Sequence, residues 1–170
     1  MAKALFVIAP ENFRDEEYFK PKEILEKAGH IVITASTKRG ICKGMLGGKA
    51  KTDILIGDAI EDNFDSLVVI GGSGSTKLWD LSELQQLFHA FYDANKPIAA
   101  ICLATVALMR SGLTQGKRVT GWSPEANIEA AKQGAQYTNA GVEEDDLFIT
   151  GKGPEFAEQF GRKILKRLQK

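Results

Sequence analysis

The 170-residue sequence has few of the residues that build disulfide frameworks and metal sites. It holds two cysteines, Cys42 and Cys102, and two histidines, His30 and His89. The cysteines form no CxxC pair, and the four residues have no zinc-ligand spacing. We therefore expect no disulfide framework, no bound metal and a chain that remains reduced inside the cell.

The sequence also lacks an excess of one charge and a long apolar run. Its 22 basic residues balance 22 acidic ones, which removes the electrostatic argument for nucleic acid or an anionic membrane as a partner. The longest apolar stretch, residues 98–109, is shorter than the ~20 residues that a spanning helix needs. The N-terminus shows no cleavage-site pattern of a signal peptide. We expect a soluble, cytoplasmic protein with one domain over residues 1–170.

Short apolar runs alternate with longer amphipathic segments along the chain. The pattern predicts strands at residues 4–9, 30–36, 67–70, 98–102, 118–122, 135–137 and 147–150. It predicts helices at residues 15–28, 82–94, 104–111, 124–133 and from about 154 onward, and a small hairpin within residues 37–59. Strands that are apolar throughout and separated by helices indicate an α/β fold, in which helices cover both faces of a mostly parallel sheet.

Ligands of such sheets bind beyond the carboxyl ends of the strands, so three loops matter most: residues 10–17, 71–76 and 102–105. The stretch GGSGSTK in the second loop does not match a phosphate-binding loop, and no GxGxxG follows a predicted strand. We therefore expect no nucleotide and no other cofactor. Gly71 and Gly72 are then either a simple tight turn or a turn whose N–H groups face a pocket.

Cys102 ends the strand PIAAIC and is followed at once by the helix LATVALM. A residue at such a strand-to-helix turn projects above the sheet edge, as in a nucleophile elbow. The helix N-terminus favours the thiolate, so we expect a lowered pKa for Cys102. The alternative is a buried cysteine that serves only packing.

Four carboxylates crowd the first loop, and Glu17 is one turn into the following helix. From there its side chain can point back over the strand ends. A carboxyl group buried near a thiolate has a raised pKa, remains protonated and donates a hydrogen bond to the sulfur. Most of the other carboxylates are expected to be solvated partners of the helix N-terminus.

Six segments occur in the order and spacing of the ThiJ/PfpI superfamily, also called the DJ superfamily, which includes the intracellular protease I group. They are VIAPENFRDEE, KAGHIVITAS, FDSLVVIGG, KPIAAICLA, GKRVTGW and LFITGKGP. The resemblance covers nearly the whole chain and implies a flavodoxin-like three-layer sandwich. It also implies that Cys102 is the reactive nucleophile and that Glu17 hydrogen-bonds it. The N–H groups of Gly72 and Leu103 would form an oxyanion-hole-like pair, and the chain would be a homodimer or higher homo-oligomer.

The sequence departs from this family at two histidine positions. Leu103 follows the cysteine where protease-like members have histidine, and Trp122 stands where the glyoxalase or deglycase branch has one. A cysteine protease needs a proton carrier for the leaving amine, so peptide hydrolysis ranks low. The leading hypothesis is addition of Cys102 to small electrophiles such as 2-oxoaldehydes, with Trp122 as a wall of the pocket. One alternative is a redox sensor or stress-response protein in which Cys102 becomes oxidised. Another is an inactive scaffold that binds a metabolite.

Overall fold

The computed structural model describes all 170 residues. Its centre is a seven-stranded sheet in the order β11-β12-β8-β7-β1-β3-β6, in which only the edge strand β11 is antiparallel to its neighbour. These strands span β1 Lys3–Val7, β3 Ile31–Ser36, β6 Ile54–Leu55, β7 Ser66–Val69, β8 Ile98–Ile101, β11 Val142–Asp145 and β12 Phe148–Gly151. The predicted mostly parallel α/β sheet is therefore confirmed.

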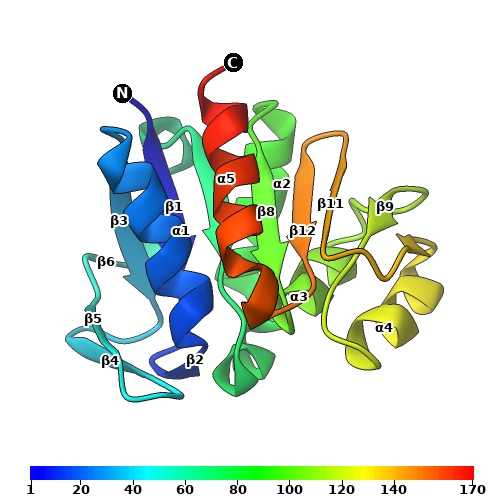
Figure 1. The fold of residues 1–170 in the computed structure, drawn as a ribbon, viewed down its shortest axis with the longest axis horizontal. Helices are drawn as coiled ribbons and strands as arrows, with labels where there is room; N and C mark the ends of the chain where they lie inside the picture. The colour runs from blue at the N-terminus through cyan, green and yellow to red at the C-terminus, as the bar shows by residue number, and fades with distance from the viewer.

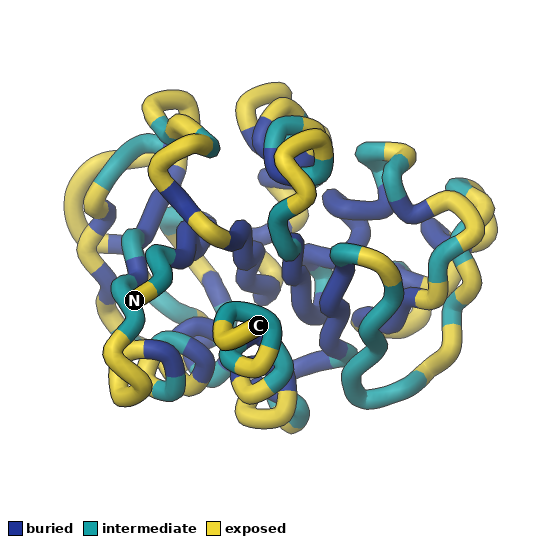
Figure 2. The backbone as a smooth tube through the Cα atoms, turned by 90° about the horizontal axis from the view of Figure 1, so that it is seen from above, coloured by how far each residue is buried: buried dark blue, intermediate teal, exposed yellow.

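Helices cover both faces of this sheet, which gives the expected three-layer sandwich. The helix α1 (Asp15–Lys27) and the helix α5 (Ala157–Leu168) pack on one face. The helices α2 (Ser82–Asp93) and α3 (Ala104–Arg110) pack on the other. Figure 1 shows α1 and α5 side by side in front of the strands, and Figure 2 shows the buried strands as a middle layer between helices.

Alternation along each strand divides the core into two clusters. In β1, Leu5 and Val7 face α2 and α3, whereas Ala4 and Phe6 face α1 and α5. Every residue of β7, β8 and β12 is buried, which is typical of strands covered on both sides. This explains why their sequences are mostly apolar, with Ser66 and Thr150 as the buried polar exceptions.

The helix α1 is one continuous helix across Pro21, although a proline inside a helix usually kinks or breaks it. Gly161 of α5 lies directly against this proline, since a Cβ at Gly161 would meet Pro21 Cα at 2.9 Å. The absence of a side chain on α5 thus lets the two helices approach closely. That packing holds the interrupted turn in place despite the missing N–H.

The predicted hairpin is β4 (Ile41–Gly44) with β5 (Lys49–Lys51), and β2 (Glu11–Phe13) joins it as a small second sheet. Asp15 at the start of α1 anchors the hairpin turn by accepting the N–H groups of Leu46 and Gly48 at 2.7 and 2.8 Å. Its buried carboxylate is therefore a structural anchor and differs from the solvated carboxylate that the sequence predicts. Cys42 packs inside this unit, with its Sγ 3.3 Å from Thr52 Oγ1.

A small unit at the β11 edge contains β9 (Arg118–Val119), α4 (Glu125–Gln133) and β10 (Gln136–Tyr137). Neither β2, with the sequence ENF, nor β11, with the sequence VEED, is an apolar run, so the apolar pattern predicts no strand at either place. Four 3-10 segments complete the fold: η1 Ile56–Asp58, η2 Glu61–Asn63, η3 Ser73–Leu78 and η4 Pro154–Phe156. None of the helices has the length and apolar character needed to span a bilayer.

Candidate functional site

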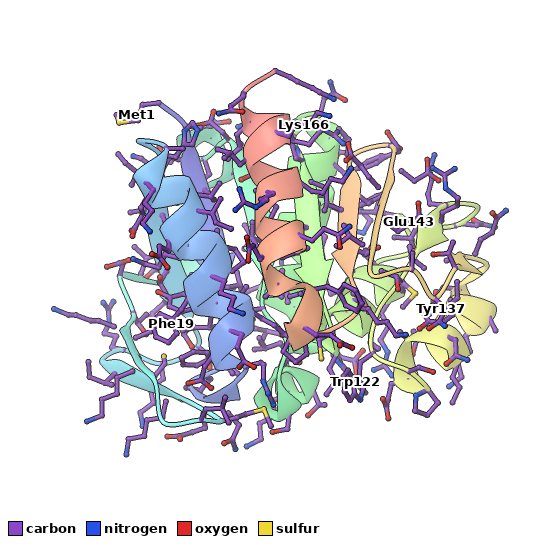
Figure 3. All side chains as sticks on the ribbon, viewed as in Figure 1. Met1, Phe19, Trp122, Tyr137, Glu143 and Lys166 are labelled. Atoms are coloured by element: carbon purple, nitrogen blue, oxygen red, sulfur yellow. The ribbon has the colours of Figure 1, made fainter.

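The three loops selected from the sequence meet where the adjacent strands β1, β7 and β8 end. The loop after β1 leads through β2 into α1, the loop after β7 contains Gly71 and Gly72, and β8 runs directly into Cys102. The N–H of Arg14 donates to Gly71 O at 2.9 Å, which joins the first two loops. This end of the sheet lies opposite both chain termini, as Figures 1 and 3 show, and Trp122 is beside it.

Cys102 has a φ of +61°, a backbone conformation that residues other than glycine rarely adopt. Hydrogen bonds from both sides hold it there. Its N–H donates to Gly151 O at 2.9 Å, and its carbonyl accepts the N–H of Trp122 at 3.3 Å and the hydroxyl of Thr105 at 2.9 Å. A left-handed residue costs about 1–3 kcal/mol and persists only where the surroundings fix it. The elbow geometry predicted at Cys102 is present.

Gly71 and Gly72 are required by close approach. A Cβ on Gly71 would lie 2.6 Å from Glu17 Oε1 and 2.7 Å from the Cβ of Cys102, so these two side chains flank the same point. Gly72 has φ of +103°, and its Cα packs on the backbone of Asn12 and Arg14. These two glycines therefore do more than form a turn, because they let three chain segments converge around the sulfur.

Glu17 is completely buried, and neither of its carboxylate oxygens has a hydrogen-bond partner that meets ordinary geometry. A buried carboxylate without a partner is costly, so the group remains protonated over a wide pH range. Burial raises the pKa of Glu17 to about 8, while the neighbouring Cys102 and the N–H of Gly71 act in the opposite direction. The predicted protonated carboxyl beside the cysteine agrees with this environment.

The predicted lowering of the Cys102 pKa is wrong. Cys102 is only 5% exposed, and burial raises the pKa of its thiol, with the charge of an ionised Glu17 as the second cause. The N–H groups of Leu103 and Gly72 partly oppose this rise in the thiol pKa. Burial is the largest cause because the sulfur lies beneath the surface, where a thiolate would lose its hydration.

The other two predicted site residues also lie at the elbow. Leu103 is half-buried and begins the turn into α3. Trp122 follows the short strand β9, and its ring packs against Gly153, whose Cβ would lie 3.1 Å from two ring carbons. The indole is 44% exposed, so it forms an open rim beside the elbow.

Both histidines make their hydrogen bonds away from the elbow. His30 Nδ1 accepts the N–H of Ala2, at the opposite end of β1, and His89 Nε2 lies 3.1 Å from Ser111 O beyond the end of α3. Neither can reach Cys102, as the sequence predicts. No group of three or more His, Cys, Asp or Glu side chains is arranged to hold a metal ion.

Two residues of the site were missed from the sequence. Arg14 caps the start of α1, and its guanidinium donates two hydrogen bonds of 3.0 Å to Glu16. Trp79 follows η3, and its indole Nε1 donates to Leu103 O at 2.8 Å. Trp79 and Leu103 are 24 positions apart, and no local pattern signals such a contact.

Comparisons with known proteins agree with this fold. A sequence profile described as the DJ-1/PfpI family matches residues 2–167. The chain is 43% identical to the uncharacterized protein MJ0967 of Methanocaldococcus jannaschii, over 99% of this chain and 83% of that protein. It is 30% identical to the putative cysteine protease YraA of Bacillus subtilis, over 99% and 100%.

A more distant relative, the deglycase PYRAB04690 of Pyrococcus abyssi, is 26% identical over 97% of this chain and 99% of that protein. Among solved structures, the ThiJ/PfpI domain protein of Brachyspira murdochii superposes with a TM-score of 0.95 at 30% identity, covering 98% of this chain and 96% of that one. With the profile match spanning nearly every residue and the fold shared throughout, the chain belongs to the DJ-1/PfpI family.

Proposed function

We propose that this protein is an enzyme that converts small electrophilic carbonyl compounds such as 2-oxoaldehydes, with Cys102 as the nucleophile and Glu17 as the proton carrier. The observation that carries the proposal is the buried, unpartnered carboxyl of Glu17 beside a cysteine at an elbow. A carboxyl whose pKa is about 8 can exchange protons near neutral pH. The relative named a deglycase supports this chemical class.

The first step uses the ionised form of Glu17. As Cys102 Sγ forms a bond to the aldehyde carbon, the carbonyl π electrons move to oxygen and the thiol proton passes to the Glu17 carboxylate. The N–H groups of Gly72 and Leu103 are the proposed donors to the developing oxyanion. Such donors contribute on the order of 3 kcal/mol each. Glu17 then returns the proton to that oxygen, which gives a hemithioacetal.

The remaining steps need no external oxidant. Glu17 removes the hydrogen on the aldehyde carbon as a proton and returns it to the adjacent carbonyl carbon by way of an enediol, while the hydroxyl proton moves to the neighbouring oxygen. The hemithioacetal thereby becomes the thioester of a 2-hydroxy acid. Water hydrolyses this thioester and releases the Cys102 thiol. The net reaction adds one water to the 2-oxoaldehyde. No step requires a histidine, which fits the positions of His30 and His89.

The test uses proton NMR to measure the consumption of methylglyoxal and the appearance of lactate. The wild type should form lactate, Cys102→Ala should form none, and Cys42→Ala should keep wild-type activity because Cys42 is buried in the hairpin unit. The wild-type kcat/KM should rise with pH up to about 8 as Glu17 ionises. Absence of lactate from the wild type across pH 6–9, or full activity of Cys102→Ala, would refute the proposal.

Redox sensing is the second candidate, because a protonated Glu17 can donate a hydrogen bond to an oxidised Cys102. Oxidation to the sulfinate consumes two equivalents of peroxide, each of which transfers one oxygen atom to sulfur and leaves as water. The buried thiol with its raised pKa makes this slower than at an exposed thiolate. The protein is treated with mild peroxide, its intact mass is measured, and the modified residue is mapped. A selective gain of two oxygen atoms at Cys102 supports redox sensing.

A further inference from the structure

The residue that follows Cys102 is anchored through its carbonyl by a side chain from the segment that follows Gly72. The indole Nε1 of Trp79 donates to Leu103 O at 2.8 Å, where β8 turns into α3. Trp79 comes directly after η3, the 3-10 segment that begins at Ser73. One hydrogen bond therefore connects the two loops that carry the proposed oxyanion donors.

Two further contacts join the same pair of segments. Gln85 Nε2 donates to Ala107 O at 2.9 Å, and Arg110 Nη1 donates to Asp80 Oδ2 at 2.8 Å. The three anchored positions on α3 and its start are 103, 107 and 110, spaced i, i+4 and i+7. This spacing places them on one face of the helix, so residues 79–85 bind along its whole length.

Both the indole and the backbone of Trp79 are held by neighbouring side chains. The guanidinium carbon of Arg110 lies 4.9 Å from the centre of the Trp79 ring, within range of a cation–π contact. Arg110 also pairs with Glu129 of α4 at 3.1 Å, and Glu129 is only 5% exposed. Gln85 Nε2 donates to the Trp79 carbonyl at 3.0 Å. The Nε1–H therefore points at Leu103 O from a ring that has little freedom to turn.

We propose that Trp79 is a positioning residue for the reaction, which holds the N–H groups of Gly72 and Leu103 in register around Cys102 Sγ. This proposal rests on the proposed function, in which those two N–H groups stabilise the oxyanion. Trp79 touches neither the sulfur nor the substrate and acts through the carbonyl of Leu103, which belongs to the peptide after the one that carries the Leu103 N–H. Its loss leaves the Cys102 carbonyl with its contacts from Thr105 and Trp122 and leaves Leu103 O with the N–H of Val106 at 3.3 Å, so Leu103 is held less firmly beside the sulfur.

The physical reason is that oxyanion donors are effective only when their position is fixed before the reaction. A donor that has to reorient as charge develops loses much of its contribution. Cys102 is in a strained left-handed conformation, so the chain around it relaxes readily when an anchor is removed. The same two N–H groups also oppose the rise in the thiol pKa, so their misalignment raises the pKa of Cys102 further.

The test is the alkylation rate of Cys102 by iodoacetamide as a function of pH, mapped by mass spectrometry, in wild type and Trp79→Phe. Phenylalanine keeps an aromatic ring beneath Arg110 and removes the Nε1–H donor together with one ring of the indole. The matched control is Tyr92→Phe, which removes an aromatic donor to Asp146 at the surface. Cys42 serves as the internal reference thiol. Gln85→Met, which leaves the indole in place, is the second variant and remains informative if Trp79→Phe does not fold.

We expect Trp79→Phe to slow Cys102 alkylation at neutral pH by about threefold to tenfold and to shift its pH profile upward. Gln85→Met should slow it less, and Tyr92→Phe should leave it unchanged. A change of less than about twofold in both Trp79→Phe and Gln85→Met would overturn the proposal. If alkylation of Cys42 changed by the same factor as alkylation of Cys102, the proposal would also be overturned, because such a result indicates a general loosening of the fold. Alkylation does not need the carbonyl reaction, so absence of lactate formation in wild type would overturn the proposed function separately.

Discussion

Replacing Glu17 with glutamine should stabilise this protein, and the gain should grow with pH. The carboxyl is completely buried with two unpartnered oxygens, and burial raises its pKa from 4.5 to about 8. The folded state therefore binds this proton more tightly than the unfolded state does. The stability that the protonated group provides is fully present below about pH 4.5 and is lost as the pH rises through about 8.

The magnitude follows from linkage. Between the two pKa values the unfolding free energy of the wild type falls by about 1.4 kcal/mol per pH unit from this group alone. Glutamine imitates the protonated carboxyl and does not titrate. The advantage of Glu17→Gln should thus rise to about 3 kcal/mol at neutral pH and level off near 5 kcal/mol above pH 8.

Urea unfolding followed by tryptophan fluorescence, at fixed protein concentration and at several pH values from 4.5 to 8.5, measures this difference. Glu129→Gln is the matched control, since Glu129 is also buried but pairs with Arg110 and accepts a hydrogen bond from Gln133 at 2.9 Å. It should destabilise the protein at neutral pH. A difference between Glu17→Gln and wild type that does not change with pH, or that falls as pH rises, would show that Glu17 is ionised in the folded protein.

Two other substitutions test the geometry around the site. Gly72→Ala should lower the unfolding free energy by about 1–3 kcal/mol and slow Cys102 alkylation, because φ is +103° and the new Cβ meets the backbone of Arg14; wild-type stability would contradict the close approach. Asp15→Ala should cost about 1–3 kcal/mol and speed hydrogen exchange at the Leu46 and Gly48 amides, which lose their acceptor. Unchanged exchange at both amides would show that the hairpin turn is held by other contacts.

The layers of the fold and the location of the site could be predicted from the sequence because they depend on burial. Strands buried on both faces are apolar at every position, and residues 67–70 and 98–102 show this directly. Parallel strands end at one edge, so the residues that follow them meet there. The strand β11, with the sequence VEED, lies at the edge and is only half-buried, so its charged residues do not form the apolar pattern that predicts a strand.

The electrostatics of the site could not be predicted in the same way. The position of Cys102 before a helix suggests a stabilised thiolate, but the depth of the sulfur and the nearby Glu17 decide the direction of its pKa shift. The contact of Trp79 with Leu103 O depends on how η3 packs against α3, which is a property of the tertiary structure. Local spacing carries information about periodicity and turns but not about long-range hydrogen bonds.

The same proton on Glu17 therefore links stability and proposed activity in opposite directions. As the pH rises toward 8, the folded protein loses stability because the carboxyl ionises in the unfolded chain while it stays protonated in the buried site. Near pH 8 the folded protein gains the carboxylate that accepts the Cys102 proton. Glu17→Gln should separate the two effects, with higher stability and no base. A site that served only packing would have no reason to keep an unpartnered carboxyl at this point, since glutamine of the same shape is the more stable choice.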